Sequence, residues 1–106
     1  MRQMSARQLK EHLEQSKNPP LLLDVREPWE YEVCRIDGAQ LVPMRSIPAA
    51  LDRFDREQEI VVICHHGIRS RQVATYMEHQ GFKNIINLQG GVAGWAQEVD
   101  PSMPTY

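Results

Sequence analysis

Short apolar runs alternate with amphipathic stretches along the chain. Four runs are almost free of polar residues: 21–25, 41–42, 60–63 and 85–88. Such runs predict strands that are buried on both faces, as in a parallel sheet. The clearest is 60–63, Ile-Val-Val-Ile, because β-branched residues favour strands.

Helical spacing falls between these runs. Ser5 and Gln8 form a capping-box pattern before a narrow stripe of Leu9 and Leu13, and the Asn-Pro-Pro of residues 18–20 ends that helix. Further helices are predicted from about residue 28, from 47 to 54, from about 70 to 80, and after 90–91. The two prolines after residue 99 predict an irregular tail.

Strands that alternate with helices predict an α/β protein, in which a parallel sheet carries helices on both faces. The length of 106 residues predicts one domain over residues 1–106, with the tail at about 99–106. In such sheets ligands bind beyond the carboxyl ends of the strands. This rule directs attention to residues 24–27 and 64–70.

Charge and composition exclude several classes of function. Twelve basic and fourteen acidic residues give a net charge of −2, which argues against nucleic-acid binding and against attraction to anionic membranes. No apolar run is long enough for a membrane helix, and the first residues do not form a secretory signal. Two cysteines, Cys34 and Cys64, make no disulfide framework, so we expect a cytoplasmic protein with reduced thiols.

Cys64 follows the clearest strand and precedes a tight loop and a helix. The start of a helix offers free amides and partial positive charge, Gly67 allows a curved backbone, and Arg69 adds a guanidinium. These features favour a thiolate, and they predict a nucleophile at the floor of an anion-binding loop. The alternative is a structural cysteine, since free cysteines are often buried. The order strand, cysteine, loop, arginine and helix favours the nucleophile.

Residues 64–70, Cys-His-His-Gly-Ile-Arg-Ser, resemble the active-site loop of rhodanese-type sulfurtransferases, in which arginine follows cysteine after four residues. Other motifs of that family occur in the same order between about residues 21 and 95. They are Leu23-Asp24-Val25-Arg26-Glu27-Pro28, Ile36-Asp37-Gly38-Ala39 with Pro43, Gly81-Phe82, Leu88-Gln89-Gly90-Gly91 and Trp95.

The resemblance implies a three-layer α/β/α fold around a five-stranded, mostly parallel sheet. It implies that Cys64 takes sulfane sulfur from thiosulfate or a persulfide, becomes a persulfide, and passes the sulfur to a thiol or to cyanide. The loop would bind the substrate through His65, His66, Gly67, Ile68, Arg69 and Ser70. The chemistry requires no metal and no cofactor.

Loop length distinguishes this family from the cysteine phosphatases, whose pattern places five residues between cysteine and arginine. Only four separate Cys64 from Arg69, which disfavours phosphatase activity. Thiosulfate-specialised relatives often carry a cation inside the loop, where this chain has His65 and His66, so a persulfide or protein donor remains open. We expect the two histidine side chains to diverge, with at most one facing the pocket.

Asp24 and Arg26 follow another strand towards the same edge of the sheet. We expect Asp24 to support the site by anchoring backbone or an arginine. Arg26 has two interpretations: a cation at the rim that binds anionic donors, or the ion-pair partner of a nearby glutamate. Cys34 stands in a Cys-Arg-Ile segment where the family usually has Gly-His-Ile, and a spectator thiol is favoured over a resolving one.

A second hypothesis makes the chain a sulfur carrier or docking module that exchanges persulfide sulfur with a partner protein. Residues 100–106 resemble the ends of rhodanese domains fused to adenylylating enzymes of sulfur-carrier pathways.

Overall fold

The centre of the protein is a sheet of five parallel strands, as seen in a computed structural model that describes residues 1–106. The strands are β1 (Arg2–Met4), β2 (Leu21–Asp24), β3 (Gln40–Leu41), β4 (Ile60–Ile63) and β5 (Ile85–Leu88). Their order across the sheet is β1-β5-β4-β2-β3, so β4 lies in the middle. The five-stranded parallel sheet is confirmed.

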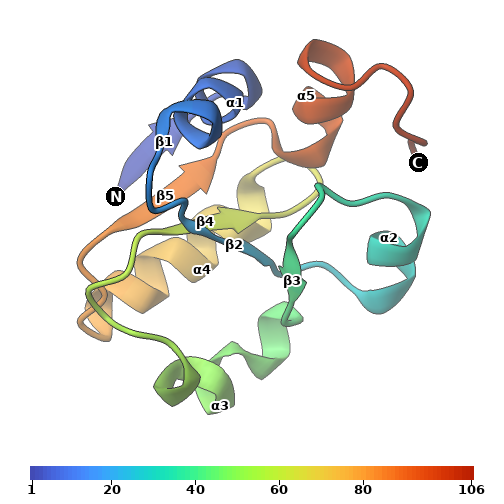
Figure 1. Ribbon diagram of the computed structural model, residues 1–106. Coiled ribbons are helices and arrows are strands. Elements are labelled where there is room, and N and C mark those ends of the chain that lie inside the picture. The colour runs from blue at the N-terminus through green and yellow to red at the C-terminus, as the bar shows by residue number, and fades with distance from the viewer.

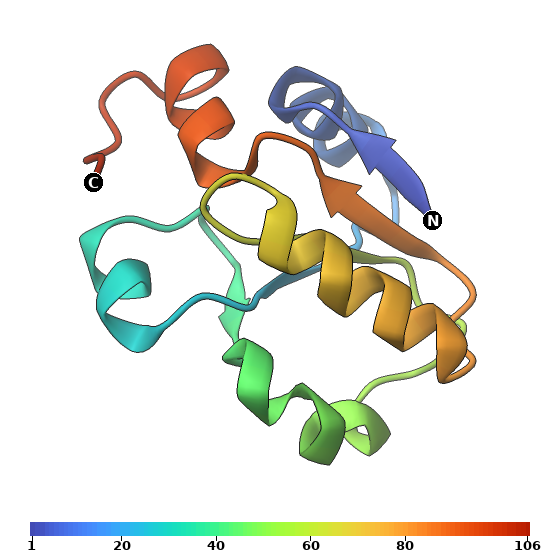
Figure 2. The same cartoon turned by 180° about the vertical axis from the view of Figure 1, so that it is seen from behind.

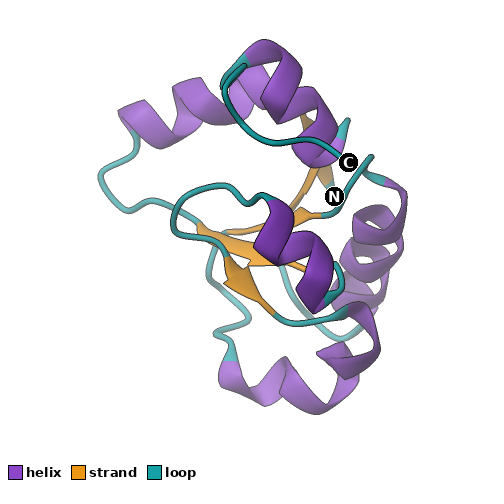
Figure 3. Cartoon of the chain, turned by 90° about the vertical axis from the view of Figure 1, so that its right-hand side faces the viewer, coloured by secondary structure: helices purple, strands orange, loops and turns teal.

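Helices cover both faces of this sheet, which gives three layers (Figures 1 and 3). They are α1 (Ala6–Gln15), α2 (Pro28–Val33), α3 (Ile47–Ala50), α4 (Ile68–His79) and α5 (Gly91–Glu98). The buried residues of α1 and α5 pack on one face, and those of α3 and α4 pack on the other. α2 follows the carboxyl end of β2, and residues after Glu98 form turns and extended chain. No helix has the length and apolar character needed to cross a membrane.

Alternate residues of the strands pack into two separate hydrophobic cores. Val61 and Ile63 of β4 join the core under α1 and α5, while Ile60 and Val62 join the core under α3 and α4. All four are fully buried, which explains why this strand is apolar at every position. Each such side chain contributes about 1.5–3 kcal/mol through burial.

The sequence pattern alone does not reveal β1, because Arg2–Met4 is short and mostly exposed. It pairs with β5 at the edge of the sheet, and Arg2 bonds Glu59 at 2.6 Å. The helix predicted over 47–54 is present over residues 47–53 but changes type along its length: the four residues of α3 lie between two 3-10 turns, Met44–Ser46 and Leu51–Arg53. The capping box of Ser5 and Gln8 is present as expected.

Candidate active site

The loop that carries Cys64 connects the carboxyl end of β4 to α4. Figure 2 shows it beside the start of α5. Gly67 caps α4 with a φ of 96°, and a side chain there would come within 3.1 Å of the backbone of Leu88 and Gly90. Only glycine combines this left-handed backbone with so close an approach, so Gly67 sets the curvature of the loop.

The sulfur of Cys64 lies inside this curve. Its Sγ accepts a hydrogen bond from the Gly67 amide at 3.0 Å, and the thiol donates to the Ser70 hydroxyl at 3.3 Å. The residue is only 1% exposed. The loop therefore hydrogen-bonds the sulfur, and the protein closes over it.

Asn87 of β5 supports the loop from the neighbouring strand. The Ser70 hydroxyl donates to Asn87 Oδ1, and Asn87 Nδ2 donates to the Gly67 carbonyl at 3.2 Å and to Gln3 Oε1 at 2.9 Å. Ser70 has a single hydroxyl proton. If Cys64 loses its own proton, its sulfur therefore competes with Asn87 for the hydrogen bond from Ser70.

The start of α5 holds the backbone of the loop. The amide of Val92 donates to the Cys64 carbonyl at 2.9 Å, and that of Ala93 donates to the His65 carbonyl at 3.1 Å. A side chain at Gly91 would collide with the carbonyl oxygens of Cys64 and His65. The pair Gly90-Gly91 therefore allows the helix to approach the backbone beside the nucleophile.

Arg69 points towards α2 and binds Glu30. Its Nη1 and Nη2 donate to the two carboxylate oxygens, each at 2.8 Å. The bonds from Arg69 lower the pKa of Glu30 to about 2, although burial opposes the shift, and the same bonds raise the pKa of Arg69. The guanidinium expected to bind an anion is thus already paired with a carboxylate.

Arg26 is fully buried, so the interpretation as a substrate-binding cation at the rim is wrong. Its guanidinium donates to Asp24 at 2.7–3.1 Å, and further bonds go to the carbonyls of Glu30 and Cys34. The ion-pair partner is Asp24 rather than a glutamate. Burial alone would lower the pKa of Arg26, but the bonds to Asp24 and Tyr106 raise it. Asp24 anchors an arginine, as its sequence position suggested.

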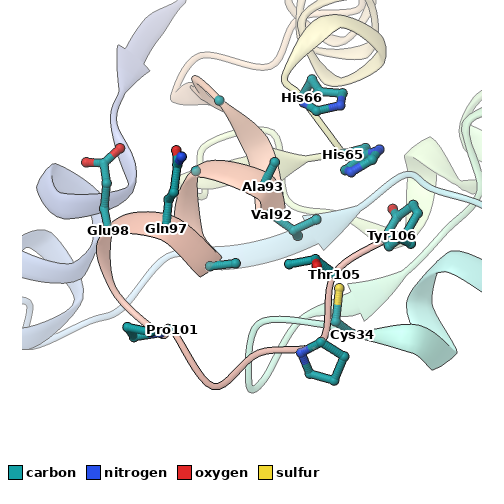
Figure 4. Close-up of a pocket in the computed structure, with 14 residues that line it drawn as sticks. Cys34, His65, His66, Val92, Ala93, Gln97, Glu98, Pro101, Thr105 and Tyr106 are labelled. Carbon is teal, nitrogen blue, oxygen red and sulfur yellow. The ribbon is translucent and has the colours of Figure 1, made fainter.

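His65 and His66 do not diverge, contrary to expectation. Their rings stack with centroids 3.9 Å apart, and both line a cavity of about 610 Å³ between α5 and the residues that follow it (Figure 4). The ring of Tyr106 stacks on the other side of His65 at 4.1 Å. Burial and His66 lower the pKa of His65, which favours the neutral imidazole.

Two other predicted residues lie apart from the sulfur. Ile68 starts α4 with its side chain 71% exposed. Cys34 is a free thiol that lines the same cavity as His65, and its Sγ lies 3.9 Å from Nη1 of Arg26. No three His, Cys, Asp or Glu side chains gather in a way that could hold a metal ion.

Glu30, Asn87 and Tyr106 belong to this site and were not predicted from the sequence. Asn87 left a signal, because one polar residue interrupts the apolar run 85–88, and a buried amide needs hydrogen-bond partners. No such signal marks Glu30 or Tyr106, because only the fold brings α2 and residue 106 to the loop.

The model of the rhodanese-like domain family matches residues 5–98. A sulfurtransferase of Allochromatium vinosum is 35% identical over 73% of this chain and 72% of its own length, and MoeZ of Mycobacterium tuberculosis, named as an adenylyltransferase/sulfurtransferase, is 32% identical over 97% of this chain. The chain spans only 26% of MoeZ and 30% of a chloroplast protein of Arabidopsis thaliana that it also matches.

The crystal structure of a rhodanese-like domain protein from Staphylococcus aureus superimposes with a TM-score of 0.85, at 33% identity, over 93% of this chain and 95% of that one. Relatives named as sulfurtransferases and as sulfur carriers both occur among the matches. The chain belongs to the rhodanese-like domain family.

Proposed function

We propose that the chain is a sulfurtransferase that carries sulfane sulfur on Cys64. The observation that supports this most is the position of Sγ, which accepts the Gly67 amide and contacts the Ser70 hydroxyl at the start of α4. The Gly67 amide stabilises negative charge on sulfur in the thiolate and again in the persulfide anion. The family membership favours the same chemistry.

The reaction takes two displacements at sulfur. The Cys64 thiolate attacks the outer sulfur of a donor R–S–SH, the donor S–S bond breaks, and its electron pair leaves on R–S⁻, which gives Cys64–S–SH. An acceptor thiolate then attacks the outer sulfur of this persulfide, and the Cys64 thiolate leaves. One S–S bond forms and one breaks in each step, so no external oxidant or reductant is needed.

The charges around the loop favour a donor of low charge over thiosulfate. Arg69 is paired with Glu30 and Arg26 with Asp24, so these four groups have no net charge. Burial and His66 lower the pKa of His65, which disfavours a positive charge on its ring. A dianion therefore finds no unpaired cation among these groups, whereas a thiol persulfide needs none.

Intact mass spectrometry tests the proposal directly. Incubation with glutathione persulfide should add the mass of one sulfur atom to the wild-type chain, and cyanide should remove it. The Cys64→Ser variant should stay unmodified, while Cys34→Ser should load like the wild type. Equal loading of Cys64→Ser and the wild type would overturn the assignment of the nucleophile.

The carrier hypothesis is the second candidate, and the observation that favours it is the match to a quarter of the much longer MoeZ. A carrier would form the Cys64 persulfide but release it only to a protein acceptor. Steady-state kinetics with cyanide and with small thiols separates the two: saturable turnover supports the enzyme, and loading without turnover supports the carrier.

A further inference from the structure

The residues after α5 lead back to the candidate active site. Ser102 donates from its amide and its hydroxyl to Asp100 Oδ1, which forms a turn. Met103 is then buried in the core under α1 and α5. Beyond that anchor the chain continues to Tyr106, which lies beside α2 and the loop (Figures 1 and 4). Tyr106 therefore belongs to the surroundings of Cys64 through the fold alone.

Four contacts hold Tyr106 at the site. Its hydroxyl donates to Glu30 Oε2 at 2.8 Å and accepts from Arg26 Nη1 at 2.9 Å. Its ring stacks on His65 and meets the edge of Trp29 with centroids 5.4 Å apart. Burial raises the pKa of Tyr106 to about 12, so the hydroxyl keeps its proton at neutral pH. Through Glu30 and His65 these contacts reach both ends of the loop.

The same segment is weakly packed on its inner side. Pro104, Thr105 and Tyr106 line the cavity of about 610 Å³ rather than a filled core, and Tyr106 is 36% exposed. Their outward movement would break two hydrogen bonds and a ring stack but would leave Met103 buried in its core. Such a segment can open locally at a cost far below that of unfolding.

We propose that Tyr106 is a specificity-determining residue of this site, which closes the approach to Cys64 against bulky sulfur donors and acceptors until it swings away. The inference rests on Cys64 as the reactive sulfur. Tyr106 bridges Glu30 of α2 and His65 of the loop, and Cys64, the residue before His65, is almost fully buried. A small persulfide needs only a narrow opening, whereas a donor carried by a protein requires the ring to leave.

Alkylation of Cys64 tests the inference independently of sulfur transfer. The rates with iodoacetamide and with pyrenyl maleimide are compared in the wild type, Tyr106→Ala and Tyr106→Phe, and peptide mass mapping separates Cys64 from Cys34. Tyr106→Ala should raise the ratio of bulky to small reagent rates by about tenfold, because two hydrogen bonds and the ring are lost. Tyr106→Phe, which keeps the ring, should raise it less.

Tyr76 provides the matched control, because it is a similarly exposed tyrosine on α4. Tyr76→Ala should leave the ratio unchanged. An unchanged ratio in Tyr106→Ala, or an equal rise in Tyr76→Ala, would overturn the inference.

A second arm measures persulfide loading from glutathione persulfide and from a persulfidated protein. In Tyr106→Ala, loading of sulfur from the persulfidated protein should rise, while loading from glutathione persulfide should change little. If Tyr106→Ala loads sulfur but its rate rises with neither donor, the inference is overturned. If no variant loads sulfur at all, the proposed function fails, and the alkylation ratio alone decides whether Tyr106 controls access.

Discussion

Glu30 of α2 holds Arg69 through two hydrogen bonds of 2.8 Å, one to each carboxylate oxygen. The arginine that ends the loop is thereby fixed in position and its charge is balanced. The same carboxylate also accepts the hydroxyl of Tyr106. One acidic side chain therefore balances the charge of Arg69 and also binds Tyr106.

Glu30→Gln should change the donor preference. The variant leaves Arg69 without a balancing carboxylate, so a dianionic donor gains an attraction that a persulfide of low charge does not. We expect kcat/KM for thiosulfate to rise by about tenfold relative to that for the persulfide of 2-mercaptoethanol, which carries no charged group apart from its sulfur. Steady-state assays with both donors measure the ratio.

Glu32→Gln is the control for this change, because Glu32 is an exposed acid on the same helix. It alters the net charge equally but should leave the ratio near the wild-type value. A ratio that shifts to the same extent in both variants would mean that net charge, rather than the release of Arg69, sets the preference.

Glu30 should also make stability depend on pH in the acid range. Because the bonds from Arg69 lower its pKa from 4.5 to about 2, the folded state favours the carboxylate. This contribution is fully present above pH 4.5 and is lost as the pH falls towards 2. At pH 7 the wild type should be more stable than Glu30→Gln by about 1–3 kcal/mol.

Denaturant unfolding of both proteins at a series of pH values measures that difference in the free energy of unfolding. The gap should narrow between pH 4.5 and about 2 and stay constant from pH 6 to 8. A gap that is the same at pH 3 and pH 7 would contradict the assignment of the shift to Glu30.

Ser70→Ala should slow the formation of the Cys64 persulfide. The hydroxyl accepts from the Cys64 thiol at 3.3 Å and donates to Asn87. Once the sulfur is charged, the hydroxyl can turn from Asn87 and donate to it, so its loss removes a hydrogen bond to the thiolate. We expect the loading rate to fall about 10- to 100-fold. Stopped-time intact mass measurements give the rate, and Ser46→Ala, at an exposed position before α3, should match the wild type. Wild-type loading by Ser70→Ala would exclude the hydroxyl from the reaction.

Asp24→Asn should destabilise the fold strongly, because it leaves the buried guanidinium of Arg26 without its countercharge. Breaking a buried pair in this way costs about 3–5 kcal/mol. The comparison is Glu57→Gln, which breaks the exposed pair with Lys83 and should cost about 0–1 kcal/mol. Chemical denaturation measures both, and similar small losses would show that Asp24 does not serve as the structural anchor.

Gly91→Ala should disturb the loop from the side of α5. The added methyl group collides with the carbonyls of Cys64 and His65, so either the helix or the loop must shift, at a cost of about 1–3 kcal/mol. Gly94→Ala, in the same helix, would make only ordinary van der Waals contacts at 3.8 Å or more, and it should be neutral or slightly stabilising. The expected signature is slower sulfur loading in Gly91→Ala alone, and equal loading in both variants would contradict it.

The parts of this architecture that could be predicted from the sequence are those encoded locally. The run 60–63 is apolar at every position because β4 lies between two cores, and the Ser5 capping box marks the start of α1 within four residues. Gly67 and the position of Cys64 directly after the strand are also local signals, and they indicated the loop.

Features that depend on distant segments escaped prediction. β1 is recognisable only by its pairing with β5, about 84 residues away along the chain. The burial of Arg26 and the stacking of His65 against Tyr106 arise because α2 and the last residues meet at the loop. A charged residue after a strand is equally compatible with the rim and with the interior until its partners are known.

The bonds from the first amides of α5 to the carbonyls of Cys64 and His65 have a consequence for biosynthesis. During synthesis, Cys64 leaves the ribosome about thirty residues before position 92, where the segment that braces its loop begins. Until residues 92 and 93 emerge, the loop that carries Cys64 lacks the two hydrogen bonds from the start of α5. The loop around Cys64 therefore reaches its braced form only after residues 92 and 93 have been synthesised.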